Sequence, residues 1–258
     1  MTDALIGSSG YVGSALLRQR QFAAQFRSTN AEQMRGGTYD VAVCAAAPAQ
    51  KWIANRDPAA DERNIDGLIG HLQAMRCRQF VLVSTVDVFA APIAVTEESP
   101  VDEAGLQAYG RNRRKLETAA QSLFPGCLVV RLPGLVGPGL RKNVIFDFLN
   151  DNNLGAIDSR GLFQFYPMVN LWTDIEVALR AGISLVHLTA EPVSVADVAL
   201  EGFGRRFEQA LPGTPARYDM RSSHASLFGG QGPYQYSRRE SLMAIRAYAQ
   251  SEPRSPPK

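Results

Sequence analysis

The sequence predicts an α/β fold with a doubly wound parallel sheet, and three observations support this class. Apolar runs of strand length alternate with helical patterns along the first 140 residues. Helical segments of this length between strands are typical of βαβ units, whose strands run parallel. A glycine-rich turn lies between the first apolar run and the first helical pattern, as it does in Rossmann-type folds.

The elements of this first part follow in order. In the segment 60–75, Ile65, Leu68, Ile69 and Leu72 recur at helical spacing. Between Asn30 and Asp40 the chain is short and polar, with room for a turn or a stub of helix only. One strand is therefore expected to be missing after the second. We expect strands within 4–10, 22–28, 40–48, 79–89 and 127–135, and helices at 11–21 and 60–75.

The pattern loosens after residue 140, where a smaller C-terminal region is expected to pack against the sheet and bind a substrate. Its tail, 251–258, is rich in proline and charge and is expected to be disordered. The expected division is 1–140, 141–250 and 251–258. The elements expected in this region are helices at 143–150, 172–182 and 193–211 and a strand at 184–190.

The composition is ordinary for a soluble globular protein of 258 residues, with 45% hydrophobic and 20% charged residues. A net charge of +2 gives no electrostatic case for binding nucleic acid or an anionic membrane. No apolar run approaches the roughly 20 residues of a membrane span. Cys44, Cys77 and Cys127 lie far apart without metal-ligand spacing, which indicates buried thiols in a reducing compartment. We expect a cytoplasmic protein without a metal.

The glycine turn predicts a dinucleotide site. Gly7, Gly10 and Gly13 would let the backbone turn tightly and approach a pyrophosphate, which the N–H groups at the start of the next helix could bind. Ser9, Tyr11 and Val12 lie between these glycines and would line the same site. The alternative is a tight turn that only packs a helix closely against the sheet.

The identity of the dinucleotide depends on the end of the second strand. NAD-binding folds usually have an acid there, which accepts a hydrogen bond from the ribose. Here the strand ends in Arg27, Ser28 and Thr29, which could instead bind a 2′-phosphate. This favours NADP, unless Arg27 is simply an exposed arginine.

Polar residues gather where the fourth strand ends. Ser84, Thr85 and Asp87 follow its apolar residues, and ligands of open α/β sheets bind outside the carboxyl ends of the strands. Farther along, Tyr109 is expected to share one helical face with Arg113 and Glu117, which follow at intervals of four residues.

Several motifs in this order resemble the extended short-chain dehydrogenase/reductase family, the NAD(P)-dependent sugar-nucleotide epimerases and dehydratases. The resemblance covers residues 4–145 closely and 160–200 loosely. Besides the glycine turn, it rests on the alanine pair Ala46 and Ala47, the Asn-x-x-Gly helix at Asn64 and Gly67, the Ser/Thr strand ending at Thr85, the Tyr-Gly helix at Tyr109, and the Arg…Gly-Pro segment at Arg131, Gly137 and Pro138.

The resemblance implies a role for each matching residue. Tyr109 would be the acid/base of hydride transfer at a sugar carbon, Thr85 its hydroxyl partner, and Arg113 the cation that the family supplies as lysine. Asp87 lies near the position of an acid in the family's dehydratases, although it could equally cap a turn. The residues implied beside the cofactor are Ala46, Ala47, Pro48, Ser84, Tyr109, Arg113 and Pro133.

Arg113 is the main departure from the family pattern. A free phenol, with a pKa near 10, needs a nearby cation to ionise at neutral pH. Arginine keeps a positive charge and can donate to ribose hydroxyls, but it is bulkier than an ammonium and does not pass on a proton. We expect dinucleotide binding to survive and catalysis to be slowed or retained with adjusted geometry. The alternative is an Arg113–Glu117 pair on a solvated face, with Tyr109 only packing.

The substrate side is less informative. Arg141, Lys142 and Asn143 follow the Gly-Pro turn and could bind a nucleotide diphosphate, although most such residues are simply solvated. His224 lies in a segment, 216–237, that is rich in Tyr, Arg and Gly, as loops near ligands often are; it could equally be a hydrogen-bonded structural histidine.

The leading hypothesis is an NAD(P)-dependent oxidoreductase, epimerase or dehydratase that acts on a nucleotide-linked sugar, in a fold that allows a homodimer. The rival is a non-catalytic NAD(P)-binding protein, a sensor or scaffold, with the same fold. Arg113, the missing strand and Phe89, where the family often has tyrosine, favour the rival. Tyr109 and Thr85 together favour the enzyme, because a binding protein needs neither.

Overall fold

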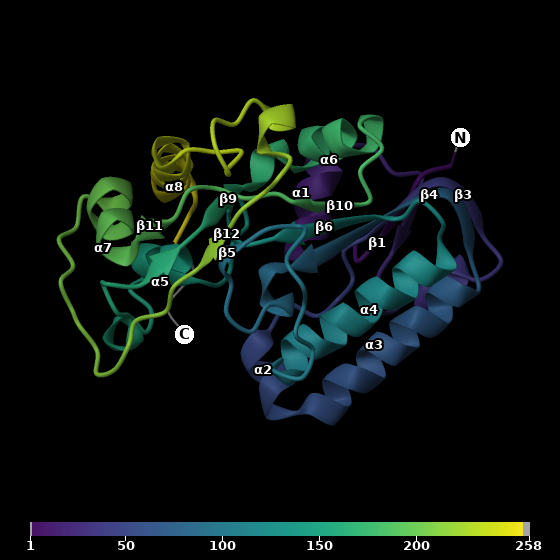
Figure 1. The fold of residues 1–258 in the computed structure, drawn as a ribbon, viewed down its shortest axis with the longest axis horizontal. Coiled ribbons are helices and arrows are strands. Elements are labelled where there is room, and N and C mark those ends of the chain that lie inside the picture. The colour runs from purple at the N-terminus through teal and green to yellow at the C-terminus, as the bar shows by residue number, and fades with distance from the viewer. Residues whose placement is uncertain (1, 255–258) are drawn as a thin grey trace. The chain divides into compact units, whose positions relative to one another are not determined.

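The structure is a computed structural model that describes residues 2–254, and these residues form two compact units (Figure 1). The first unit contains the chain up to Ala91, then Ser99–Leu132 and Leu171–Val186. The second contains Pro92–Glu98, Pro133–Asn170 and the described residues from His187 onward. The expected single boundary at residue 140 is therefore replaced by crossings at several points, because the chain returns to the first unit to add an edge strand.

A six-stranded sheet forms the centre of the first unit, in the order β10-β6-β4-β3-β1-β2. The pairings from β2 through β6 are all parallel, which confirms the predicted fold class. The strands of this sheet are β1 (Ala4–Ile6), β2 (Ala24–Phe26), β3 (Thr38–Cys44), β4 (Arg76–Thr85), β6 (Leu128–Leu132) and β10 (Leu185–His187).

The sheet lacks the strand that many doubly wound folds have after the second strand, and the sequence predicted this absence. β2 is the outermost strand on its side, and a 3-10 turn, η1 (Ala31–Met34), occupies the interval before β3. Eleven residues separate the two strands, too few for a helical crossover followed by another strand.

Helices cover both faces of this sheet: α3 and α4 lie together on one face, and α1 and α6 on the other (Figure 1). Asp57 begins α3 by accepting a hydrogen bond from the backbone N–H of Ala60, and Pro58 occupies the first helical turn. The helices of the first unit are α1 (Tyr11–Gln19), α2 (Lys51–Arg56), α3 (Pro58–Gln73), α4 (Ala108–Leu123) and α6 (Leu171–Arg180).

The strands of the sheet are buried because both faces are covered. All residues of β1 and β6 are buried, which explains why they read as continuous apolar runs rather than as alternating ones. The three cysteines belong to this core; Cys44 and Cys127 are buried and Cys77 half-buried. Burial raises the pKa of Cys44 and of Cys77 to about 11 and that of Cys127 to about 12. Thiols with such pKa values are unreactive at neutral pH.

The second unit is built from short strand pairs and helices. β5 pairs with β12, β7 with β9, and β8 with β11. Helix α8 contacts α5, β7 and β9. The elements of this unit are β5 (Ile93–Val95), β7 (Gly134–Val136), α5 (Val144–Asn150), β8 (Leu162–Phe163), β9 (Phe165–Pro167), β11 (Val193–Ser194), α7 (Val195–Asp197), β12 (Asp219–Met220) and α8 (Arg238–Ser251).

Two expectations for this unit were wrong. The helix expected at 193–211 stops early, because α7 passes into one π-helical turn, Val198–Gly202, and Gly204 then adopts φ +64°. Helix α8 was not anticipated, although Ser237 and Glu240 form a capping box at its start. Ser251, assigned to the expected disordered tail, is the last residue of α8, and 255–258 lie outside the described residues. Within residues 2–254, no helix is long and apolar enough to cross a membrane.

Candidate active site

The turn between β1 and α1 has the geometry that its glycines predict. Gly7 has φ +90°, and a Cβ atom there would lie 2.5 Å from the carbonyl oxygen of Ala45 at the end of β3. A Cβ atom on Gly13 would overlap the carbonyl oxygen of Gly7. Close packing of the helix against the sheet therefore requires both glycines, so these two positions alone do not separate the two interpretations of the turn.

Packing explains Gly10 less fully than the other two glycines. A Cβ atom on Gly10 would lie 3.3 Å from the carbonyl oxygen of Gly7, a close contact but a much smaller overlap than at Gly7 or Gly13. Gly10 is also the N-cap of α1 and has no side chain to occupy the space in front of the helix N-terminus. An open, uncapped helix start beside a tight turn fits the pyrophosphate of a dinucleotide.

The end of β2 lies beside this turn. The carbonyl oxygen of Phe26 accepts hydrogen bonds from the backbone N–H groups of Gly7 and Ser8, at 2.8 and 3.0 Å. Arg27, Ser28 and Thr29 come next and are exposed. No acid stands in this segment, so the structure leaves an exposed guanidinium where NAD-binding folds usually have a carboxylate.

Tyr109 lies at the start of α4, close to the carboxyl end of β4. A Cβ atom on the next residue, Gly110, would overlap the carbonyl oxygen of Asp87, so only glycine lets the helix come this close. Tyr109 is 8% exposed, and its side chain lies beside that of Thr85, the last residue of β4, which lowers the pKa of the phenol. The structure thus brings together the two side chains that the sequence singled out.

The charges around Tyr109 act on its pKa in opposite directions. Burial raises the pKa of Tyr109 above its usual value and is the largest effect. The Arg113 and Lys51 charges and the hydrogen bond from Thr85 lower it, while the Asp87 carboxylate raises it. A base at this position needs its cations to offset both burial and the nearby carboxylate.

Arg113 is buried at 3% exposure, which contradicts a solvated face for this side of α4. Its guanidinium donates to the carboxylate of Asp61 on α3 and to the carbonyl oxygen of Pro48 after β3. Its central carbon lies 4.0 Å from the centre of the Tyr109 ring, in cation–π contact. It does not pair with Glu117. Arg113 therefore ties α3, α4 and the segment after β3 together, which sequence spacing alone did not reveal.

Glu117 forms a second buried ion pair on the same helix. Its carboxylate accepts two hydrogen bonds from Arg131 of β6, at 2.9 and 2.7 Å, and one each from Arg114, at 3.0 Å, and Ser84, at 2.6 Å. The hydroxyl of Ser84, predicted to face the cofactor, therefore donates to Glu117.

Lys51 is a site residue that the sequence analysis missed. It begins α2, and its ammonium nitrogen lies 2.7 Å from a carboxylate oxygen of Asp87. Asp87 thus takes part in an ion pair. The turn after β4 is capped instead by Thr85, whose hydroxyl oxygen accepts from the backbone N–H of Asp87. Because β3 and β4 are parallel neighbours, their carboxyl ends share one edge of the sheet, and a charged residue soon after β3 could have been suspected on that ground.

The residues predicted to bind substrate all lie in the second unit. Asn143 caps α5: its side-chain oxygen accepts from the backbone N–H groups of Ile145 and Phe146, and its amide donates to the carbonyl oxygen of Leu135. Arg141 is exposed. His224 is half-buried, and its backbone N–H donates to the hydroxyl of Ser222.

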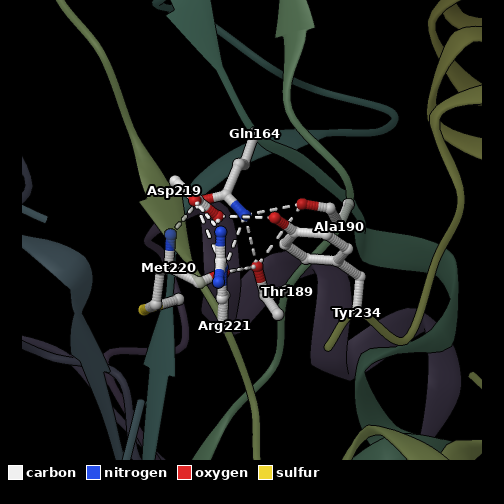
Figure 2. A network of polar contacts seen from close by, with 7 residues as sticks. All are labelled: Gln164, Thr189, Ala190, Asp219, Met220, Arg221 and Tyr234. Atoms are coloured by element: carbon white, nitrogen blue, oxygen red, sulfur yellow. Dashed lines mark hydrogen bonds and ion pairs between the residues drawn. The ribbon is translucent and has the colours of Figure 1, made fainter. Parts of the chain in front are cut away.

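A buried polar network organises the predicted substrate loop of the second unit (Figure 2). The amide nitrogen of Gln164 lies 2.6 to 2.8 Å from three acceptors, the Thr189 hydroxyl and the carbonyl oxygens of Ala190 and Met220, which share its two hydrogens, and its oxygen accepts from the backbone N–H of Met220. Beside it, Asp219 accepts hydrogen bonds from Arg221 and Tyr234. The polar side chains of this segment that suggested a ligand loop therefore also serve to hold it in place.

No protein-family model matches this chain, and no curated protein matches it by sequence. Solved structures do match it over almost its whole length. A UDP-galactose 4-epimerase superposes with a TM-score of 0.73 at 19% identity, covering 97% of this chain and 98% of that chain.

Two further structures are similar. A dTDP-glucose 4,6-dehydratase from Streptomyces venezuelae, solved with NAD bound, has a TM-score of 0.73 at 16% identity and covers 97% of this chain and 98% of its own. RMD from Pseudomonas aeruginosa, solved with NADPH, has a TM-score of 0.68 at 18% identity and covers 97% and 99%. At these identities the similarity establishes the fold, and it confirms the expected resemblance at that level.

Proposed function

We propose, from a fold shared with sugar-nucleotide epimerases and dehydratases, that this protein is an NAD(P)-dependent oxidoreductase, epimerase or dehydratase of a nucleotide-linked sugar. One observation carries the proposal: the side chains of Tyr109 and Thr85 lie beside each other at the carboxyl end of β4, where Thr85 lowers the pKa of the phenol. A protein that only binds a dinucleotide needs neither hydroxyl in that place.

In this mechanism the side chains of the protein transfer the proton. Tyr109, as phenolate, takes the proton of a sugar hydroxyl, or as phenol returns one to the carbonyl oxygen. Thr85 orients the same oxygen, and Arg113 and Lys51 favour the phenolate by their charge. A bound nicotinamide would supply the hydride acceptor or donor. The turn around Gly10 and the start of α1 would hold its pyrophosphate.

The exposed Arg27 at the end of β2 supports NADP as the preferred dinucleotide, because a guanidinium can pair with a 2′-phosphate. The substrate assignments to Arg141, Asn143 and His224 remain predictions; the Asn143 side chain already caps α5 and donates to the carbonyl oxygen of Leu135.

The first test of the cofactor is the content of freshly purified protein, released by denaturation and identified by absorbance and mass. Retained NAD(H) would indicate an epimerase or dehydratase that recycles its cofactor, and would refute the preference for NADP. Absence of a retained nucleotide, followed by tighter binding of NADPH than NADH, would indicate a reductase that exchanges cofactor.

Gly10→Ala tests the glycine turn itself. The added methyl group would lie in the turn at the helix start, 3.3 Å from the carbonyl oxygen of Gly7, so we expect dinucleotide affinity to fall at least tenfold while the urea unfolding midpoint falls only slightly. Gly67→Ala on α3 is the matched control, since a Cβ atom there meets nothing within 4 Å and should leave binding unchanged. Equal binding by both variants would contradict a pyrophosphate at this turn.

Tyr109→Phe tests the reaction. We expect kcat with UDP-galactose or dTDP-glucose as trial substrates to fall at least a hundredfold, with dinucleotide affinity retained, because general acid–base groups contribute about 10²- to 10⁴-fold. Tyr39→Phe is the control, since Tyr39 is equally buried in the same unit. Dinucleotide binding without turnover on any nucleotide sugar would favour the alternative function, a protein that only binds the dinucleotide. One observation supports this alternative: Arg113 is buried in an ion pair with Asp61, and so does not take the ribose-binding role of the family's lysine.

A further inference from the structure

The cation that the family pattern assigns to the tyrosine is occupied elsewhere in this protein. Arg113 is buried, and its two terminal nitrogens donate to Asp61 and to the carbonyl oxygen of Pro48. Its guanidinium lies over the face of the Tyr109 ring. A residue that is held from three elements has little freedom to follow the changes of charge on the phenol oxygen during a reaction.

A second cation reaches the hydroxyl side of Tyr109 through a short chain of polar contacts. The side chain of Thr85 lies beside the phenol of Tyr109 and lowers its pKa. The Thr85 hydroxyl lies 3.4 Å from one carboxylate oxygen of Asp87, and the other oxygen of that carboxylate lies 2.7 Å from the ammonium of Lys51. These residues come from α4, the end of β4, the turn after it and α2. All of them belong to the first unit.

We propose that Lys51 is a positioning residue that favours the ionisation of Tyr109, by neutralising Asp87 and holding this carboxylate beside Thr85. Its importance for turnover rests on the proposed function, whereas its effect on the phenol does not depend on any reaction.

The charges facing Tyr109 support this role. Asp87 alone would oppose a phenolate, because two negative charges would lie close together in a site that excludes most water. The ammonium of Lys51 offsets that repulsion and holds the carboxylate of Asp87 near the Thr85 hydroxyl, which lies 3.4 Å from its other oxygen. On the other side of the ring, Arg113 is itself balanced by Asp61, so its net influence on the phenol is reduced.

Lys51 is suited to an electrostatic rather than a structural role. Its side chain is 42% exposed, and exposed ion pairs contribute only about 0 to 1 kcal/mol to stability. A Lys51→Met variant should therefore fold. Lys115→Met is the matched control, because Lys115 is 40% exposed, lies on α4 and also pairs with carboxylates, those of Glu62 and Asp66.

The experiment measures the ionisation of Tyr109 directly. The full chain is labelled with 3-fluorotyrosine, whose phenol is more acidic than that of tyrosine, and the fluorine NMR signal of each residue is followed with pH. The signal absent from Tyr109→Phe identifies the residue. We expect Lys51→Met to move the titration midpoint of Tyr109 upward, Lys51→Arg to restore it in large part, and Lys115→Met to leave it unchanged.

A double variant separates charge from position. In Lys51→Met/Asp87→Asn the opposing carboxylate is also removed, so the midpoint should return toward that of the unmodified protein. A midpoint that stays the same in Lys51→Met, or that moves equally in Lys115→Met, would overturn the proposal.

Kinetics then distinguish this proposal from the proposed function. If the protein turns over a nucleotide sugar, Lys51→Met should lower kcat/KM near neutral pH about threefold to tenfold and move the rising limb of the rate–pH profile upward, with Lys115→Met within about twofold. Turnover without a change in the Tyr109 titration would refute the role of Lys51 alone. A shifted titration with no turnover on any substrate would refute the proposed function alone.

Discussion

Two buried ion pairs on helix α4 differ in how completely they are satisfied. Glu117 accepts four hydrogen bonds from Arg131, Arg114 and Ser84. Arg113 donates to Asp61 and to backbone carbonyl groups, but within residues 2–254 its Nε atom is buried without a hydrogen-bond partner.

This difference indicates two kinds of role on one helix. A fully satisfied buried network rigidifies the fold and is costly to break from one side. The incompletely satisfied pair is that of Arg113 with Asp61. Its guanidinium lies against the ring of Tyr109, at the end of the helix where the proposed reaction takes place. Buried polar groups left without a partner in native structures call for an explanation such as a catalytic role or a missing ligand.

Glu117→Gln should show the largest effect on stability. The substitution leaves the charge of buried Arg131 without its counter-charge, so the free energy of unfolding should fall by about 3 to 5 kcal/mol, measured by urea denaturation. Glu62→Gln, which breaks only an exposed pair with Lys115, should cost at most about 1 kcal/mol. Similar losses in the two variants would show that the Glu117 network does not hold the helix.

Arg113→Met should lower the free energy of unfolding by less, about 2 to 3 kcal/mol. Asp61 loses its cation but keeps the amide of Asn112 as a donor at 2.8 Å, and methionine still packs beneath the Tyr109 ring. Adding Asp61→Asn should recover at least half of the loss, because no buried charge then remains unpaired. If the double variant is no more stable than the single one, the Arg113–Asp61 contact is not a coupled pair and the comparison fails.

The change of stability with pH should be the smallest of these effects, and its sign follows from the shifted pKa of Glu117. Burial alone would raise the pKa of Glu117, but the hydrogen bonds and charge of Arg131, with help from Ser84 and Arg114, lower it overall. Since the unfolded value is about 4.3, the unfolded chain binds the proton first. This stabilisation is complete above that pH and is lost as the pH falls through the folded value.

Urea unfolding of the unmodified protein and of Glu117→Gln at a series of acidic pH values checks this expectation. Below about pH 4.3 the unmodified protein should lose stability more steeply, since glutamine takes up no proton. Parallel curves for the two proteins would contradict the assignment of a lowered pKa to Glu117.

Much of the first unit could be predicted from residue order because its signals are local. Continuous apolar runs predicted β1, β3, β4 and β6, helical spacing predicted α3, and the short polar interval between Asn30 and Asp40 predicted the missing strand. The second unit was predicted less well. Its strands are two or three residues long, and α7 passes into a π-helical turn whose end depends on packing rather than on a local signal.

The sequence by itself determined the parallel sheet and the glycine turn, since each depends on residue patterns along the chain, whereas the partnership of Tyr109 with Thr85 was implied by the family resemblance. Only the tertiary structure decided the partners of the charges. Asp61 reaches Arg113 from another helix, Arg131 reaches Glu117 from β6, and Lys51 reaches Asp87 across the edge of the sheet. An ion pair depends on a separation of a few ångströms between side chains, and residues 14 to 52 positions apart in the chain acquire that separation only when the elements pack.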